Sequence, residues 1–342
     1  MGGNALKAVK TRRYAADEYC VLRDTVLTKL RNRYPNRRIE DIRAYRAKPS
    51  FGDLDVLFEA DNFTDDVYKM LEELFQPKQI VKNSSVWSFE FNEFQVDLIF
   101  TTKKMFTSSA NYFAWNDLGN LMGRVAHKLG FKYGHDGLSF MVRDGTHQYA
   151  EIHVSSDIVE ILKFLKYDPS RFLQGFDTLE EIFQFAASSE YFNKEIYSLD
   201  NRNHASRIRD KKRKTYTEFL SWIETAENLP AYPWADLKEV GGYQYKEVFI
   251  KRAFEFFPDF KENYNATMAS FNTWQIAKSK FNGQIVSRLT GLTDKQLGEF
   301  IVVLKAKVPG SLSEWAASTP QSDIHDWILM EFNQWKTSPA LA

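Results

Sequence analysis

The sequence of 342 residues contains one cysteine, Cys20, and no excess of charge of either sign. A single cysteine excludes a disulfide within the chain and a zinc site built from several cysteines. Because 45 basic side chains balance 45 acidic ones, binding of a polyanion has to depend on local basic patches. There is no apolar run of about 18 residues, and the first residues do not resemble a signal peptide. These absences predict a soluble cytoplasmic protein, and the compact design is compatible with a virus-encoded one.

Hydrophobic periodicity predicts a mixed α/β first part. Helical spacing extends from Ala15 to Tyr34 and stops at Pro35. Two alternating runs meet at Asn92-Glu93, which indicates a tight antiparallel hairpin. We expect strands at 53–60, 86–91, 94–100, 131–134, 138–143 and 148–154, and helices at 64–75 and 117–129, the latter capped by Asn116 or Asp117.

From residue 156 onward the spacing of apolar residues is almost entirely helical. Helices are expected at 156–166, 178–188, 203–227, 244–256, 260–281, 293–307 and 322–336. The first dozen residues are basic and contain glycine, which is typical of a flexible or docking arm. The fold class predicted by these patterns is α+β, with a mixed sheet followed by an all-helical C-terminal domain.

Three aspartates lie on the polar faces of two expected strands. Asp53 and Asp55 alternate with apolar residues, so both project from one face. Asp97 lies opposite the apolar face of the later strand. If the strands are neighbours, the three carboxylates converge and form a ligand set that suits Mg²⁺, with Mn²⁺ as an alternative. Two such ions, about 3.5–4 Å apart, support in-line displacement at phosphorus. Asp-x-Asp alone also fits a solvated strand edge.

Over residues 40–170 the chain resembles the DNA polymerase beta-like (family X) nucleotidyltransferases. The palm of that family contains Ser-x-Gly-Asp-x-Asp-Val-Leu, which here is Ser50–Leu57, and a later hydrophobic strand with a third acid, here Val96–Ile99. A Tyr-Phe pair then opens a helix, as in Tyr112-Phe113. The resemblance implies an arm and helix at 1–40, a nucleotidyltransferase palm at 41–170 and a helical domain at 171–342.

The resemblance also implies roles for individual residues. Asp53 and Asp55 would hold both metals, and Asp97 would accept the 3′-hydroxyl proton or bind the catalytic metal. Tyr112 and Phe113 would shape the sugar pocket, and Asp117 would lie against the base. Asn120 and Arg124 would reach base or template edges. Core packing is the alternative for the aromatic pair, and a solvated helix face is the alternative for Asn120 and Arg124.

The stretch before the first acid departs from the family pattern. The family has a Gly-Ser pair about ten residues earlier, followed by an arginine, and these cradle the β- and γ-phosphates. Here Arg46 fits the arginine position, but the Gly-Ser pair is absent, and Arg43 is a candidate bidentate substitute. Ser50 and Gly52 complete the expected nucleotide site, because glycine permits close approach of a ligand. Trp115 replaces a small glycine beside the sugar, so sugar selection does not follow from the resemblance.

A basic segment at 203–215 predicts contact with a phosphate backbone. Its basic side chains are Arg207, Arg209, Lys211, Lys212, Arg213 and Lys214. Aromatic residues flank it at Phe183–Phe192 and at Tyr216, Phe219 and Trp222, and such residues can stack on bases. A solvated helix face is the alternative for a charge run of this kind.

These observations predict transfer of a nucleotide from a nucleoside triphosphate to a 3′-hydroxyl of DNA or RNA, as in a family-X-like DNA polymerase. The alternatives are a template-independent RNA or tRNA 3′-end nucleotidyltransferase, nucleotide attachment to a protein, and a nucleic-acid-binding protein without catalysis. The segment Leu289–Gly298 is faintly similar to the helical tails of CCA-adding enzymes. Template dependence, base preference and oligomeric state do not follow from the sequence.

Overall fold

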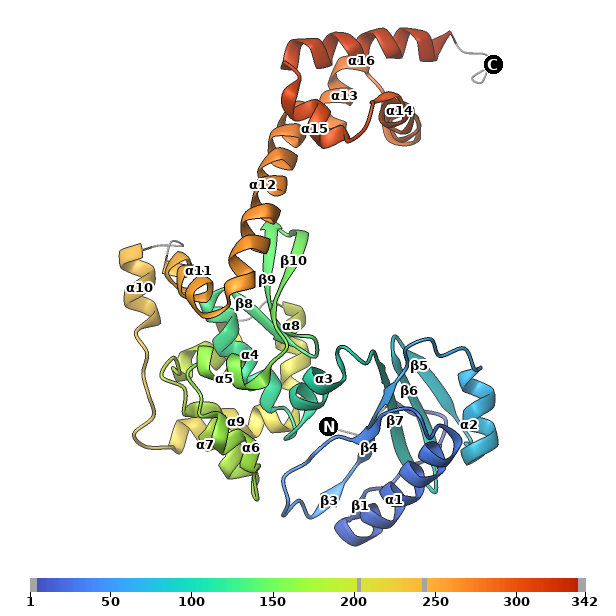
Figure 1. Cartoon of the computed structure of the whole chain (residues 1–342), viewed down its shortest axis with the longest axis vertical. Coiled ribbons are helices and arrows are strands. Elements are labelled where there is room, and N and C mark those ends of the chain that lie inside the picture. The colour runs from blue at the N-terminus through green and yellow to red at the C-terminus, as the bar shows by residue number, and fades with distance from the viewer. Residues whose placement is uncertain (1–4, 202–203, 242–244, 338–342) are drawn as a thin grey trace. The chain divides into compact units, whose positions relative to one another are not determined.

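The computed structural model describes residues 5–201, 204–241 and 245–337 (Figure 1). The chain forms two compact units, one of Met1–Met141 with His153–Phe260 and one of Val142–Ile152 with Lys261–Ala342. The predicted α+β class is confirmed, because a mixed sheet precedes a helical C-terminal region. The division near Phe260 differs from the boundary expected at 170, because the helices between these positions pack within the first unit.

A five-stranded sheet is the core of the first unit. Its order is β2 (Ile39–Asp41), β4 (Asp53–Glu59), β7 (Phe94–Thr101), β6 (Val86–Phe91) and β5 (Ile80–Asn83). Strands β4 and β7 are parallel, and the other neighbours are antiparallel. The two residues of the β6–β7 turn, Asn92 and Glu93, have φ angles of 54° and 60°. Positive φ at both positions matches the twist of a two-residue hairpin, so the predicted hairpin is confirmed.

One face of this sheet is covered by helices α1 (Ala16–Arg33) and α2 (Val67–Phe75), which confirm the helices expected there. Leu54, Val56 and Phe58 of β4 are fully buried in this core. Because side chains alternate along a strand, Asp53 and Asp55 project from the opposite face. A short pairing of β1 (Tyr14–Ala15) with β3 (Ser50–Phe51) lies just before β4 in the chain.

Helices α3 (Phe106–Phe113) and α4 (Leu118–Leu129) follow the sheet, and α3 was not predicted. The expectation that Tyr112-Phe113 opens a helix was wrong, because the pair ends α3 and the left-handed residues Trp115 and Asn116 separate it from α4. The two helices approach closely at Gly119, where an added Cβ would lie 2.2 Å from the carbonyl oxygen of Tyr112. Glycine is therefore required there, because any side chain would clash with the backbone of Tyr112. Helix α4 ends at Gly130, whose φ is 96°. The expected strands after it are confirmed as β8 (Phe131–Gly134), β9 (Gly137–Asp144) and β10 (His147–Ser155).

Helices complete the first unit: α5 (Ile158–Phe164), α6 (Pro169–Gln174), α7 (Leu179–Ala187), η1 (Lys194–Tyr197), η2 (Leu199–Asn201), α8 (His204–Lys211), α9 (Lys214–Thr225), α10 (Trp234–Gly241) and α11 (Tyr245–Phe256). The prediction of one continuous helix over 203–227 was wrong. Arg213 has extended φ and ψ angles of −88° and 107° between α8 and α9. This break redirects the chain so that α9 buries Tyr216 and Phe219 completely.

The second unit is formed mainly by helices: α12 (Pro258–Lys280), α13 (Gly283–Thr290), α14 (Asp294–Lys307), α15 (Leu312–Ser318) and α16 (Gln321–Lys336). Its core contains Phe300, Leu304, Ile324 and Ile328, all of which are fully buried. The helices expected at 260–281, 293–307 and 322–336 are confirmed, whereas α13 and α15 were not predicted. Among the described residues, no helix has both the length and the apolar character needed to cross a bilayer.

Candidate active site

Asp53, Asp55 and Asp97 meet on the face of the sheet that α1 and α2 leave open. In the parallel pairing of β4 with β7, Asp55 lies directly beside Asp97, and Asp53 is two residues earlier on the same face. One carboxylate oxygen from each residue lies within 4.8 Å of the others. The convergence expected from the sequence is therefore confirmed. We call these three residues the carboxylate triad, and together they could hold a metal ion.

Burial and mutual repulsion disfavour ionisation of the triad. Burial, reinforced by the charges of Asp53 and Asp97, raises the pKa of Asp55 well above its usual range. Burial also raises the pKa of Asp97 to about 6, although hydrogen bonds from Ser88 and Gln95 partly oppose this. A cation between the carboxylates would remove the repulsion and favour the charged forms. Three clustered hard oxygen donors suit Mg²⁺ or Mn²⁺, so the residues present fit the expected ion.

Gln95 fixes the orientation of Asp97. Its side chain is only 2% exposed, and its Nε2 donates to both carboxylate oxygens of Asp97 at 3.0 Å. Its Oε1 accepts a hydrogen bond from the backbone of Ala5 at 2.9 Å. The described part of the N-terminal arm is thus docked, since the Ala8 amide also donates to Gln79. Sequence reasoning missed Gln95, although its position two residues before Asp97 puts it on the same strand face.

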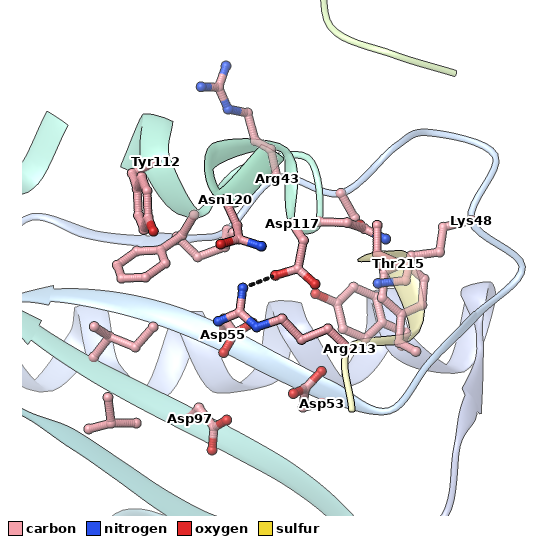
Figure 2. A pocket seen from close by; sticks show the side chains of 18 residues that line it. Arg43, Lys48, Asp53, Asp55, Asp97, Tyr112, Asp117, Asn120, Arg213 and Thr215 are labelled. Atoms are coloured by element: carbon pink, nitrogen blue, oxygen red, sulfur yellow. Dashed lines mark hydrogen bonds and ion pairs between the residues drawn. The ribbon is translucent and has the colours of Figure 1, made fainter. Parts of the chain in front are cut away.

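A cavity of about 380 Å³ adjoins the triad (Figure 2). This volume is within the range of small-molecule sites. Five residues expected to contact a nucleotide line it, namely Arg43, Tyr112, Phe113, Asp117 and Asn120. The Nδ2 atom of Asn120 is buried and has no hydrogen-bond partner in the described part of the chain. A buried donor without a partner costs free energy, so this amide is available to an acceptor on a ligand.

The other residues assigned to the nucleotide have different contacts. Arg46 forms an ion pair with Asp177 and donates to the carbonyl oxygen of Gln174 at 3.0 Å. Arg124 donates to the carbonyl oxygen of Ile196 at 3.1 Å. Neither arginine is among the residues that line the cavity. Their predicted nucleotide contacts stay predictions, and the structure assigns both arginines to tertiary contacts.

Ser50 and Gly52 are likewise outside the cavity lining. The Ser50 hydroxyl accepts hydrogen bonds from Arg13 at 3.1 and 3.2 Å. Arg43 does line the cavity, but its guanidinium points away from the triad in Figure 2 and donates to Asn111 at 2.9 Å. The phosphate contacts expected for these residues therefore have no support from their present hydrogen bonds.

Trp115 does not line the cavity, although the resemblance suggested that it lies beside the sugar. Its side chain is 4% exposed and packs edge-on against Phe176, with ring centroids 5.3 Å apart. Its φ angle is 62°, and that of Asn116 is 59°, both in the left-handed region. This backbone turns the indole into the core, where Gly175 leaves space for it.

Besides Arg43, two cationic residues line the same cavity, and we call Lys48 and Arg213 the cation pair. Lys48 lies over the Phe51 ring, with its Nζ 4.5 Å from the ring centroid. Burial lowers the pKa of Lys48, whereas the nearby charges of Asp53 and Asp55 raise it. Arg213 donates from Nη1 to Asp117 at 3.0 Å. Sequence analysis missed Lys48, and it assigned Arg213 only to the basic segment, because the contact with Asp117 spans 96 residues.

The remaining basic side chains of that segment lie on α8, at its end and at the start of α9: Arg207, Arg209, Lys211, Lys212 and Lys214. The expectation that neighbouring aromatic residues would offer stacking surfaces was wrong for Phe183, Tyr216 and Phe219. These side chains are at most 5% exposed, because they form the core under α7 and α9. Nucleic-acid binding by this surface would therefore rest mainly on charge, because Trp222 is the only partly exposed ring among the four compared.

Comparison with known proteins adds no relatives to this description. No protein-family model matches the chain, and no curated protein matches it either.

Proposed function

We propose that this chain is a metal-dependent nucleotidyltransferase of the DNA polymerase beta-like kind. It would transfer a nucleotide from a nucleoside triphosphate to a 3′-hydroxyl of DNA or RNA, with the five-stranded sheet as its palm. The observation that carries this proposal is the carboxylate triad, whose oxygens lie within 4.8 Å of one another beside a cavity of nucleotide size. Three carboxylates so close would repel one another unless cations bind between them.

In the proposed reaction, the 3′-oxygen forms a bond to the α-phosphorus while the bond to the pyrophosphate oxygen breaks. Asp97 either accepts the hydroxyl proton or serves as a third ligand of the catalytic metal. A bound cation favours its charged form, which is the form that accepts a proton. Asp53 and Asp55 hold Mg²⁺ or Mn²⁺, which when bound neutralises the charge on the attacking and leaving oxygens. Tyr112 and Phe113 bound the space for the sugar.

The cavity lining supports a base-binding role for Asn120 and Asp117. The free Nδ2 of Asn120 is a donor for an acceptor on a base. Asp117 is positioned by its ion pair with Arg213 at 3.0 Å. Because Arg213 belongs to the basic segment and lines the cavity, that segment reaches the cavity and would guide the backbone of an acceptor strand toward it.

The test is incubation of the protein with Mg²⁺ or Mn²⁺, each nucleoside triphosphate, and a panel of DNA and RNA primers. We expect primer extension by the wild type and by Asp24→Asn, which changes an exposed carboxylate on α1, but none by Asp53→Asn. Templated DNA extension supports a family-X-like polymerase, whereas extension of a tRNA lacking its 3′ end supports the tRNA 3′-end alternative. Labelling of a protein without any polynucleotide supports nucleotide attachment. Nucleic-acid binding with no transfer to any acceptor contradicts the proposal.

A further inference from the structure

The expected phosphate-binding residues are engaged elsewhere, which raises the question of what binds the phosphates. The Gly-Ser pair is absent from the sequence, Arg46 is paired with Asp177, and the Arg43 guanidinium points away from the triad. A triphosphate carries several negative charges, and the triad carries more. Divalent cations at the triad would offset part of this charge, and protein cations that face the cavity would offset more of it and bind the phosphates directly.

Lys48 is the first cation that meets this requirement. It lines the cavity and is partly buried, in the loop that leads into β3 and β4. Within the described ranges, its ammonium has no hydrogen bond or ion pair, and it lies 4.5 Å from the centroid of the Phe51 ring. An ammonium has three donors, and partial burial without an acceptor is unfavourable. Its position therefore favours an anionic ligand.

Arg213 is the second cation, and the fold holds it in place. The break between α8 and α9 puts Arg213 at the cavity, and Asp117 accepts a hydrogen bond from its Nη1 at 3.0 Å. Figure 2 shows the ion pair of Arg213 and Asp117 above the triad. A guanidinium has five donors, of which this contact uses one. A planar group with several remaining donors is well suited to phosphate oxygens.

We propose that the cation pair, Lys48 and Arg213, is the polyphosphate-binding site of the cavity and binds the β- and γ-phosphates of the triphosphate. This inference rests on the proposed function, because it concerns the same cavity. In this proposal, Lys48 before β3 and Arg213 between α8 and α9 bind the phosphates in place of Arg43 and Arg46. The leaving pyrophosphate is then held by cations that do not depend on the triad.

A ligand preference follows from this arrangement. Two cations from separate elements can each bind a different phosphate group, so affinity should increase from nucleoside monophosphate to triphosphate. Inorganic tripolyphosphate should bind even without a nucleoside and without a divalent ion. Since the ionised triad repels any anion, removal of its charge should strengthen that metal-free binding.

The experiment is calorimetric titration of inorganic tripolyphosphate into the full-length protein, in EDTA and at low salt. We expect Lys48→Gln and Arg213→Gln each to weaken binding by about tenfold, as for loss of one charge-assisted hydrogen bond. Lys104→Gln, which changes an exposed lysine outside the cavity, is the matched control and should bind as the wild type does. Lys48→Arg should recover most of the affinity lost in Lys48→Gln, because it keeps the charge. Asp53→Asn should bind tripolyphosphate more tightly than the wild type.

Two results would overturn the inference. One is wild-type affinity in both Lys48→Gln and Arg213→Gln; the other is a larger loss in Arg46→Gln than in either. Circular dichroism establishes that each variant is folded, and Lys48→Met replaces Lys48→Gln if the latter unfolds. Failure of the proposed function looks different, because then either the wild type transfers no nucleotide or Asp53→Asn transfers as well as the wild type, whatever the affinity for tripolyphosphate. If Asp53→Asn loses nucleotide transfer but Lys48→Gln and Arg213→Gln bind tripolyphosphate as the wild type does, the phosphate-site inference is wrong and the proposed function still stands.

Discussion

The carboxylate triad and the cation pair line one cavity, but the chain assembles them in different ways. The triad comes from two strands that are paired in register, so alternation along each strand already determines which face every aspartate occupies. The cation pair comes from a loop before β3 and from a break between two helices. Local periodicity thus specifies the acidic set, whereas only tertiary packing brings the two cations together.

The largest expected effect concerns the acidic set. Asp55→Asn should lower the rate of nucleotide transfer by about 10³-fold or more, because it removes a ligand charge at the proposed reaction centre. The measurement is single-turnover primer extension with Mg²⁺, and Asp24→Asn is the control. A variant that retains more than about a tenth of the wild-type rate would contradict a role for Asp55 in catalysis.

The second prediction concerns stability in the metal-free protein. Because the pKa of Asp97 is raised from 3.8 to about 6, the folded state binds this proton more tightly than the unfolded state. The resulting stabilisation is complete below pH 4 and is lost as the pH rises through 6. As the pH rises from 4 to above 6, the free energy of unfolding of the wild type should therefore fall by up to about 3 kcal/mol relative to that of Asp97→Asn.

Urea denaturation of both proteins in EDTA, at a series of pH values from 4 to 7.5, measures this difference. Addition of Mg²⁺ at pH 7.5 should restore stability to the wild type but much less to Asp97→Asn. Parallel pH profiles for the two proteins would show that Asp97 is not forced toward its protonated form.

The third prediction separates the triad from the residue that orients it. Gln95→Met removes both hydrogen bonds to Asp97 and should weaken Mn²⁺ binding by about 10- to 100-fold, as is typical for partners of metal ligands. Gln79→Met is the matched control, because Gln79 also accepts from the N-terminal arm but does not bond to Asp97 in the described structure. Equal losses in the two variants would attribute the effect to arm docking instead.

The smallest expected effect lies on the basic segment outside the cavity. Lys211→Gln with Lys212→Gln should weaken binding of single-stranded nucleic acid by a few-fold. The slope of the logarithm of the binding constant against the logarithm of the salt concentration should become less steep by about 0.7 per lysine. Lys103→Gln with Lys104→Gln neutralises another exposed adjacent pair and serves as the control. Fluorescence anisotropy at several salt concentrations gives this slope for each double variant. Identical slopes for the two double variants would show that the end of α8 does not contact the nucleic acid.

The same contrast explains how much of the molecule was predictable. The strands β4, β6 and β7, their hairpin and helix α1 followed from periodicity and turn residues, and the meeting of the triad followed from them. The break at Arg213 did not, because the sequence around it has continuous helical spacing and tertiary burial of α9 decides the conformation. Aromatic residues near α8 were misassigned as stacking surfaces, since sequence alone does not distinguish a core ring from an exposed one.

The contacts of the predicted arginines could not be derived from the sequence either. Arg46 pairs with Asp177, which is 131 residues away, and Arg124 binds a carbonyl 72 residues away. A motif match shows that an arginine occupies a given position in the sequence. The hydrogen-bond partner of that arginine depends on which distant segment of the chain packs beside it. Lys48 was overlooked for the same reason, since a single lysine in a loop has no pattern that separates it from a solvated one.

Titration of Mn²⁺ into the full-length protein, followed by electron paramagnetic resonance, tests the central claim most directly. We predict saturable Mn²⁺ binding by the wild type and by Asp24→Asn, with binding lost in Asp53→Asn combined with Asp55→Asn. Unchanged Mn²⁺ binding in that double variant would show that the three aspartates do not form a metal site, and the proposed enzymatic function would fall with it.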